Sequence, residues 1–193
     1  MIGRLTGKLI GKEPPLLWID VGGVGYECEA PLSTFYKLPD VGQGVSLHTH
    51  LIVREDAQIL VAFAGAAEKA LFRQLIKLSG VGPKSALTIL SGISVDDFWD
   101  TVRAQDSAKL TRLPGIGKKT AERLVLELKD KAGEHATTAQ KPGAVDGVVP
   151  QAVSALINLG YKPAEAQRLA EAAYKSGDSP ETVIREALKR ALR

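Results

Sequence analysis

Cysteine is almost absent from this sequence, and no long apolar run occurs in it. Cys28 is the only cysteine among 193 residues, which excludes an intrachain disulfide and a zinc site built from cysteines. No segment approaches the roughly 18 consecutive apolar residues of a membrane span, and residues 1–12 are not followed by a signal-peptide core. A single thiol fits a reducing compartment. We therefore expect a cytoplasmic protein without a membrane partner.

Neither basic nor acidic residues are in large excess, but the charged residues are unevenly distributed along the chain. The formal net charge is +3. Residues 1–65 carry five basic and seven acidic side chains, residues 66–131 carry twelve and eight, and residues 132–193 carry eight and seven. The positive charge therefore lies in the middle of the chain. Such a segment is compatible with nucleic-acid binding and equally with an ordinary solvated surface.

The first 65 residues have the pattern of a small barrel. Turns separate short apolar runs, and residues 22–25 (GGVG) are predicted to form a tight hairpin turn, because their three glycines do not fit the dinucleotide-binding pattern G-x-G-x-x-G and no helix follows them. The length and one short helix within residues 31–38 favour a five-stranded oligonucleotide-binding (OB) barrel. The predicted strands are residues 2–10, 16–21, 26–30, 45–53 and 59–63.

Helical periodicity begins at Ala66 and continues, with one interruption, to the end of the sequence. The interruption is the polar, glycine-containing and proline-containing segment 133–148, which is predicted to be a flexible linker. After it, three short amphipathic helices are predicted over residues 149–159, 164–175 and 180–192. The expected fold class is therefore α+β, with a barrel (1–65), a central helical domain (66–132) and a small three-helix bundle (149–193).

A nine-residue segment of the central domain occurs twice. Residues 78–86 (LSGVGPKSA) return 35 positions later as residues 113–121 (LPGIGKKTA). Each copy predicts a glycine–apolar–glycine turn before a helix, whose first N–H groups and positive dipole end attract anions, and the lysines add full charges. Two such turns suit two phosphates of a nucleic-acid backbone, held without reading a base. The predicted contacts are Gly80, Val81, Gly82, Lys84, Ser85, Gly115, Ile116, Gly117, Lys118, Lys119 and Thr120.

These glycines and lysines have two other interpretations. For either copy alone, a simple helix–helix turn with Val81 or Ile116 as its apolar plug is the better interpretation, and the repetition with lysine at the same offset favours phosphate binding. A P-loop is excluded, because the position of its first glycine is Arg112 and the residue after Lys118 is Lys119. We therefore expect no ATP hydrolysis by this chain alone and no cofactor.

Short motifs along the whole chain together resemble one family. They are residues 1–4 (MIGR), 21–26 (VGGVGY), 53–57 (VREDA), the two repeated turns, and 159–161 (LGY). The repeat resembles the helix-hairpin-helix motif, which binds DNA backbones irrespective of sequence, and the whole chain resembles the RuvA family of Holliday-junction-binding subunits. The resemblance implies a homotetramer, or an octamer of two tetramers, that holds a four-way DNA junction open. It implies RuvB, a hexameric AAA+ ATPase motor, as partner, and admits a junction resolvase as another.

The resemblance also gives roles to residues that the sequence alone leaves unassigned. Glu55 and Asp56 are by themselves ordinary turn residues, but in RuvA-like proteins the matching pair forms an acidic pin near the junction centre. In RuvA relatives the C-terminal domain contacts the motor, and the predicted motor-binding residues in it are Leu156, Leu159 and Tyr161. The alternative is that these three fill the core of the small domain, and we expect this of at least one.

Further signals point to no catalytic or metal site. His48 and His50 alternate along one predicted strand, and too few soft ligands lie near them in sequence to predict a metal site. Trp18 and Trp99 are predicted to be packing residues. Two other classes stay open: a structure-selective nuclease with Glu55 and Asp56 as metal ligands, and a scaffold that binds only proteins.

Overall fold

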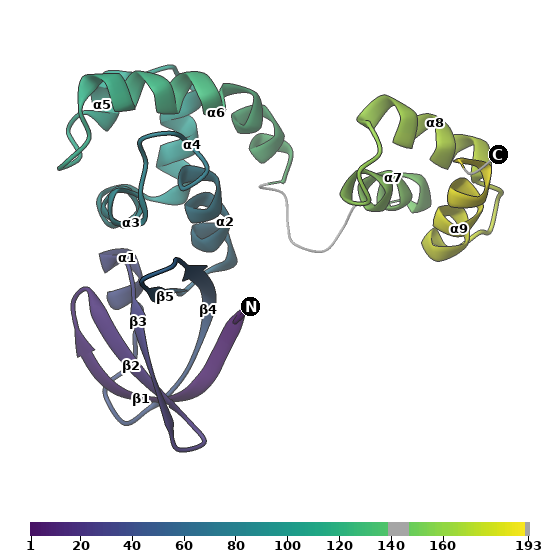
Figure 1. Ribbon diagram of the computed structural model, residues 1–193. Helices are drawn as coiled ribbons and strands as arrows, with labels where there is room; N and C mark the ends of the chain where they lie inside the picture. Colours follow the sequence, from purple (N-terminus) through teal and green to yellow (C-terminus); the bar gives the residue numbers. More distant parts are fainter. Residues whose placement is uncertain (139–146, 192–193) are drawn as a thin grey trace. The chain divides into compact units, whose positions relative to one another are not determined.

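The computed structural model describes residues 1–138 and 147–191 (Figure 1). The chain divides into two compact units, Met1–Thr137 and Thr138–Arg193. The first contains a barrel and a helical domain, and the second contains a helical bundle. No helix in the described residues has both the length and the apolar character needed to cross a membrane.

A closed barrel forms the N-terminal part of the first unit, in which every residue is described. Its spatial order is β1-β2-β3-β5-β4, with a single parallel contact between β3 and β5 and antiparallel pairing elsewhere. The short helix α1 (Leu32–Phe35) connects β3 to β4. This arrangement confirms the predicted five-stranded OB barrel. The strands are β1 (Arg4–Glu13), β2 (Leu16–Val21), β3 (Val24–Glu29), β4 (Gly44–Val53) and β5 (Gln58–Phe63).

The barrel interior is filled by alternate residues of its strands, as the pleat of a strand requires. Leu17 and Ile19 of β2 are fully buried, whereas Trp18 between them is half-buried and donates its indole N–H to Glu27 at 2.9 Å. Cys28 is also fully buried, and desolvation, with a smaller effect of Glu27, raises the pKa of its thiol to about 12. The lone cysteine therefore stays a protonated core residue at neutral pH.

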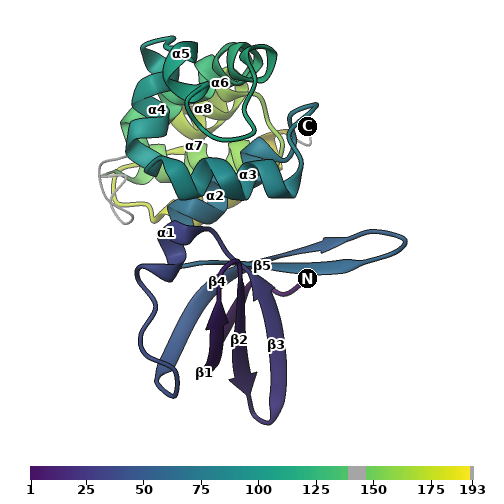
Figure 2. The ribbon, with the colours of Figure 1, turned by 90° about the vertical axis from the view of Figure 1, so that its left-hand side faces the viewer.

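The barrel has two further exposed hairpins besides the one between β1 and β2. Gly22 and Gly23 have φ of +63° and +91°, and the N–H of Gly23 donates to Asp20 Oδ1 at 2.7 Å, which confirms a tight turn between β2 and β3. The turn is shorter than predicted, because Val24 and Gly25 already pair with β2 as the first residues of β3. The second hairpin, between β4 and β5, extends away from the body of the barrel (Figure 2). Its tip carries Glu55 and Asp56.

The helical domain packs on the β4–β5 side of the barrel through a shared core. Phe63 of β5 lies 5.0 Å from Phe72 of α2 between ring centroids, and both are fully buried. Trp99 is 1% exposed and meets Phe98 edge-on, which confirms its packing role. The helices are α2 (Ala66–Leu75), α3 (Pro83–Gly92), α4 (Val95–Arg103), α5 (Ser107–Leu110) and α6 (Lys118–Thr138).

Helix α6 is longer than the sequence pattern predicted. It continues to Thr138, so the first six residues of the predicted linker 133–148 are helical, and the predicted boundary at residue 132 is wrong. Gly133 lowers helix propensity by about 1 kcal/mol, which an established helix tolerates when no proline follows at once. Residues 139–146 of the predicted linker lie outside the described residues.

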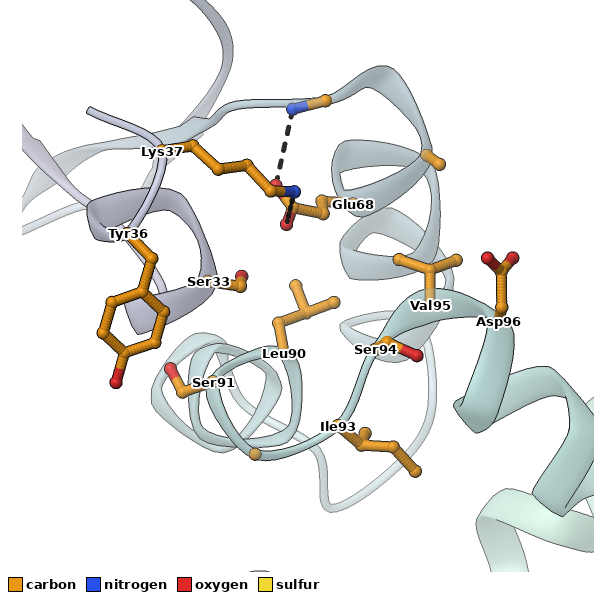
Figure 3. Close-up of a pocket in the computed structure, with 13 residues that line it drawn as sticks. Ser33, Tyr36, Lys37, Glu68, Leu90, Ser91, Ile93, Ser94, Val95 and Asp96 are labelled. Atoms are coloured by element: carbon orange, nitrogen blue, oxygen red, sulfur yellow. Dashed lines mark hydrogen bonds and ion pairs between the residues drawn. The ribbon is translucent and has the colours of Figure 1, made fainter. Parts of the chain in front are cut away.

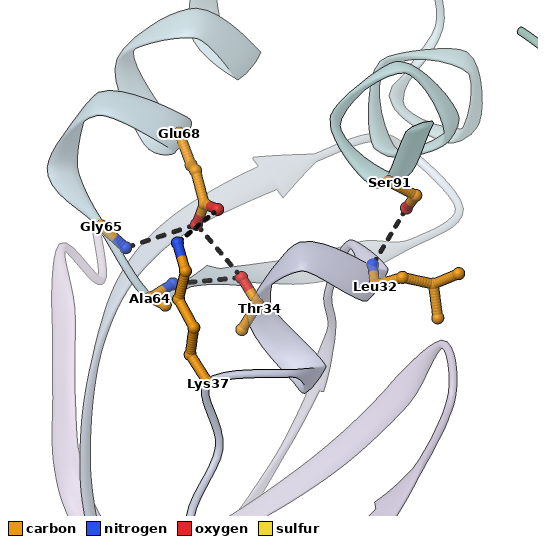
Figure 4. Close-up of polar contacts among 7 residues, drawn as sticks. All are labelled: Leu32, Thr34, Lys37, Ala64, Gly65, Glu68 and Ser91. Atoms are coloured by element: carbon orange, nitrogen blue, oxygen red, sulfur yellow. Dashed lines mark hydrogen bonds and ion pairs between the residues drawn. The ribbon is translucent and has the colours of Figure 1, made fainter. Parts of the chain in front are cut away.

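A buried glutamate joins the barrel to the helices. Glu68, in the first turn of α2, is 6% exposed and pairs with Lys37 at 3.2 Å across the edge of a cavity of about 570 Å³ (Figure 3). Its other oxygen accepts a hydrogen bond from Thr34 of α1 at 3.3 Å and from the N–H of Gly65 at 3.4 Å (Figure 4). A buried carboxylate needs such partners, so these bonds fix α1 against α2.

Helix α1 is also bonded to α3. The N–H of Leu32 donates to Ser91 Oγ at 3.0 Å (Figure 4). At the next position of α3, Gly92 leaves room for Leu113, because a Cβ there would lie 2.6 Å from Leu113 Cδ2. The barrel, the α2–α3 pair and the turn before α6 are therefore held in one compact unit.

The second unit is a three-helix bundle, as predicted. Its helices are α7 (Val148–Asn158), α8 (Pro163–Ala173) and α9 (Pro180–Ala191), each beginning and ending within two residues of its predicted range. Alanine supplies most of the core, which lets the helices approach closely. The buried residues are Ala152, Leu156, Ala166, Ala170, Ala173, Val183 and Ala187.

Candidate nucleic-acid interface

The first copy of the repeat forms the turn between α2 and α3. Gly80 has a φ of +83°, a conformation that favours glycine and turns the chain sharply. The N–H of Val81 donates back to the Leu78 carbonyl at 3.1 Å, and the N–H of Ala86 donates to the Gly82 carbonyl at 3.0 Å. Helix α3 therefore begins immediately after Gly82.

The second copy repeats this structure bond for bond between α5 and α6. Gly115 has a φ of +75°. The N–H of Ile116 donates to the Leu113 carbonyl at 3.2 Å, and the N–H of Ala121 donates to the Gly117 carbonyl at 3.0 Å. The sequence repeat is thus two helical hairpins with the same backbone. We name their exposed ends the first corner (residues 80–85) and the second corner (residues 115–120).

Both corners present free N–H groups at a helix N-terminus. Gly82 caps α3 without a side chain, so the first amides of the helix are not covered by a serine or aspartate oxygen. Within the described part of the chain, no acceptor receives the N–H of Gly82, Lys84, Ser85, Gly117, Lys118, Lys119 or Thr120. Unpaired amides at the positive end of a helix dipole bind anions.

Two glycines of the corners are not required by anything in the described part of the chain. Gly82 has an ordinary φ of −83°, and Gly117 also lies outside the left-handed region, so neither backbone conformation requires glycine. A Cβ at either position would meet nothing within 4 Å. A side chain there would, however, stand between the free amides and any partner. This pattern indicates a surface that another molecule approaches closely.

The lysines of the corners are free to bind that molecule. Lys84, Lys118 and Lys119 are exposed, and no carboxylate among the described residues lies within ion-pair distance of them. Ser85 and Thr120 are half-buried beside them, each three residues after the second glycine of its corner. The corners thus combine open backbone with uncompensated positive charge.

Val81 and Ile116 do not belong to this surface. Both side chains are 5% exposed and lie in the domain core, and both N–H groups are used within the turn. Their prediction as backbone-binding residues is wrong, and the alternative interpretation, an apolar plug, is correct for these two. The reason is the turn itself, which directs the residue between the glycines inward.

Two further basic residues match the repeat and were missed in the sequence. Lys77 and Arg112 each precede the first glycine of a corner by three positions, both are exposed, and they are 35 residues apart. Extending the repeat by one residue toward the N-terminus would have found them. Each corner is therefore flanked by a basic residue on the side of the preceding helix as well.

The β4–β5 hairpin carries an isolated pair of acids. The N–H of Arg54 donates to the Ala57 carbonyl at 2.8 Å, which leaves Glu55 and Asp56 as the exposed two-residue tip. Neither acid has an ion-pair partner in the part of the chain that the structure describes. No group of three or more histidine, cysteine, aspartate or glutamate side chains that could hold a metal ion occurs among those residues.

The three residues predicted to contact a motor occupy different environments. Leu156 is fully buried in the bundle core, so its prediction as a contact residue is wrong, in line with the expectation that at least one would fill the core. Leu159 is 60% exposed, just after α7, and Tyr161 is half-buried against the bundle. Gly160 between them has a φ of +101°, which ends the helix and separates the two side chains.

Two cavities lie in the first unit. The cavity in Figure 3 contains none of the predicted site residues. A second cavity, of about 770 Å³, reaches from Pro14 and Pro15 of the barrel to Lys84 and Pro114 beside the corners. Its lining and that of the first include neither histidine nor cysteine.

Comparisons with known proteins cover the whole chain. Three family models match it: RuvA N terminal domain over residues 1–60, SAM-like Helix-hairpin-helix tandem over residues 72–130, and RuvA, C-terminal domain over residues 147–192. A protein of Thioalkalivibrio sulfidiphilus is 54% identical over 201 residues, covering 100% of both chains. One of Stutzerimonas stutzeri is 54% identical over 198 residues, covering 98% of each. Both are named Holliday junction branch migration complex subunit RuvA.

Proposed function

Because the chain belongs to the RuvA family, we propose that it is the DNA-binding subunit of a Holliday junction branch-migration complex in homologous recombination and DNA repair. It holds four-way DNA open and recruits an ATP-driven motor, and it does not hydrolyse ATP itself. The observation that carries this proposal is the pair of exposed corners, with free amides, unpaired lysines and two glycines that nothing inside the chain requires.

Each corner is proposed to hold one stretch of sugar-phosphate backbone. The free amides bind a phosphate oxygen, and the glycines let the backbone come close, while Lys84, Lys118 and Lys119 neutralise charge. Lys77 and Arg112 extend each contact. None of these groups reads a base edge, so binding is independent of sequence and depends steeply on salt.

The acidic tip is proposed to act as a pin where the strands exchange. In a homotetramer, two carboxylates per chain place eight negative charges near the junction centre. They repel phosphates and favour separated strands over a stacked crossover. The exposure of Glu55 and Asp56 at the end of an extended hairpin, without ion-pair partners among the described residues, supports this role. An octamer would enclose the DNA between two such faces.

A comparison of four-way, duplex and single-stranded DNA without ATP tests the proposal. We expect the protein to shift four-way DNA at lower concentration than duplex or single strands, with no dependence on base sequence. Affinity should fall about 10³-fold or more between about 50 and 200 mM salt, because several lysines release counterions. Cleavage of the junction with magnesium would identify a nuclease instead, and no shift at low salt would identify a protein scaffold.

The bundle is proposed to dock the motor RuvB through its exposed apolar residue Leu159. A Leu159→Asp substitution should weaken binding of the bundle to RuvB about tenfold or more, since it places a charge in an apolar contact, while leaving the helical content unchanged. Calorimetry of the full chain with RuvB measures this. Tyr174→Ser, at another exposed apolar position, is the matched control. Equal loss in both variants, or in neither, would contradict the assignment of Leu159.

The site of action is proposed to be the cytoplasm. The protein's one cysteine is a free, buried thiol, which suits a reducing compartment, and bacterial chromosomal DNA lies there.

A further inference from the structure

An arginine of the second hairpin is bonded to the residue just before the first corner. Arg123 lies in the second turn of α6, and its Nη1 donates to the Ser79 carbonyl at 2.7 Å. The same Nη1 would lie 3.6 Å from a Cβ at Gly80. Its Nε is 3.8 Å from a carboxylate oxygen of Glu127, one helical turn further on. One side chain thus spans from α6 to the turn before α3.

Comparison of the two copies of the repeat shows that a helical hairpin does not need this contact in order to form. The position equivalent to Arg123 in the first hairpin, 35 residues earlier, is Thr88. The Thr88 hydroxyl donates to the Lys84 carbonyl of its own helix at 3.0 Å and does not reach another element. A hairpin therefore forms without arginine at this position. The arginine occurs in the second copy, whose helix α6 is bonded to the turn of the first copy.

We propose that Arg123 is a positioning residue that fixes the first corner relative to the second, so that both bind the same DNA without rearrangement. The inference rests on the proposed function of the corners. Two anion sites on one rigid body gain affinity from each other only when their spacing already matches the phosphates. A planar guanidinium with several fixed donors suits this contact better than the single flexible ammonium group of lysine.

The binding test uses Arg123→Gln and Arg123→Lys in the full chain. Affinity for four-way DNA should fall about tenfold in Arg123→Gln, the usual weight of a hydrogen bond to a charged group. Arg123→Lys keeps the charge and should stay within about threefold of Arg123→Gln. The slope of log K against log salt should not change, whereas loss of a direct phosphate contact lowers it by about 0.9. Full recovery in Arg123→Lys, or a lowered slope, would show a direct charge contact and overturn the proposal.

Arg103→Gln is the matched control. Like Arg123, Arg103 donates from Nη1 to a main-chain carbonyl. The acceptor is Ala132 of α6, at 3.4 Å. Ala132 lies about 20 Å along the helix from Lys118, away from both corners. This variant removes the same charge and the same kind of bond, so it should bind four-way DNA like the unmodified protein. A tenfold loss there would show that any weakened helix contact lowers affinity, and would overturn the specific role of Arg123.

Hydrogen exchange of the free protein tests, in the absence of DNA, whether the bond from Arg123 to Ser79 stabilises the first corner. In Arg123→Gln, the hydrogen-bonded amides of Val81 and Ala86 should exchange at least about threefold faster, although the substitution lies 37 residues after Ala86, while barrel amides keep their rates. Unchanged exchange at the first corner would overturn the proposal. If the unmodified protein fails to bind four-way DNA, the proposed function fails, and the exchange result still decides whether Arg123 holds the corner.

Discussion

Replacement of Lys84, Lys118 and Lys119 together by glutamine is expected to abolish binding of four-way DNA. Three ammonium groups leave each chain, and each phosphate contact contributes about 0.9 to the slope of log K against log salt. The loss therefore exceeds the effect of any single exposed residue. All three side chains are exposed, and none has an ion-pair partner among the described residues, so the thermal midpoint should stay unchanged. Fluorescence anisotropy with labelled junctions measures the loss.

Two further variants serve as comparisons. The first tests whether the position of the removed charges matters, and the second tests whether close approach of the DNA to the corners matters. Neutralising Lys162, Lys175 and Lys189 of the bundle changes the net charge equally and should leave junction binding nearly intact. Gly82→Ala with Gly117→Ala keeps every charge, meets no atom inside the chain, and should still weaken binding strongly, because the methyl groups cover the free amides. Retained affinity in the triple lysine variant would refute the assignment of the corners.

The features that sequence analysis predicted correctly are those set by local periodicity and turn chemistry. The barrel strands, the Gly22–Gly23 hairpin and the three helices of the bundle follow from alternation, helical periodicity and glycine. The sequence also indicated both corners, because a repeated glycine pattern can be recognised without knowledge of the tertiary structure. Local signals were sufficient wherever neighbouring residues decide the conformation.

The errors arise where the outcome depends on packing. Leu156 and Leu159 are three residues apart and equally apolar, yet one is fully buried and the other 60% exposed, because only the first faces α8 and α9. Val81 fell within a motif of surface residues, but its turn directs it inward. The bond from Arg123 to Ser79 joins residues 44 positions apart, and no local pattern indicates it.

Glu55→Gln with Asp56→Asn is expected to spare junction binding or tighten it, and to reduce discrimination between four-way and duplex DNA. The amides keep the shape of the turn, which is closed by the backbone bond from Arg54 to Ala57. At about 10 Å in water, one carboxylate repels a phosphate by about 0.4 kcal/mol before screening, so removing eight charges from a tetramer tightens binding several-fold. Anisotropy with both DNA forms measures this.

The same variant should change migration more than binding, because a pin without charge no longer keeps the exchanging strands apart. The rate of junction movement with RuvB and ATP measures this effect. Glu13→Gln with Asp40→Asn, two exposed acids elsewhere on the barrel, removes the same charge and should leave both discrimination and migration unchanged. If the pin variant instead loses junction affinity, Glu55 and Asp56 attract part of the DNA or a bound cation, and repulsion at the tip is not their role.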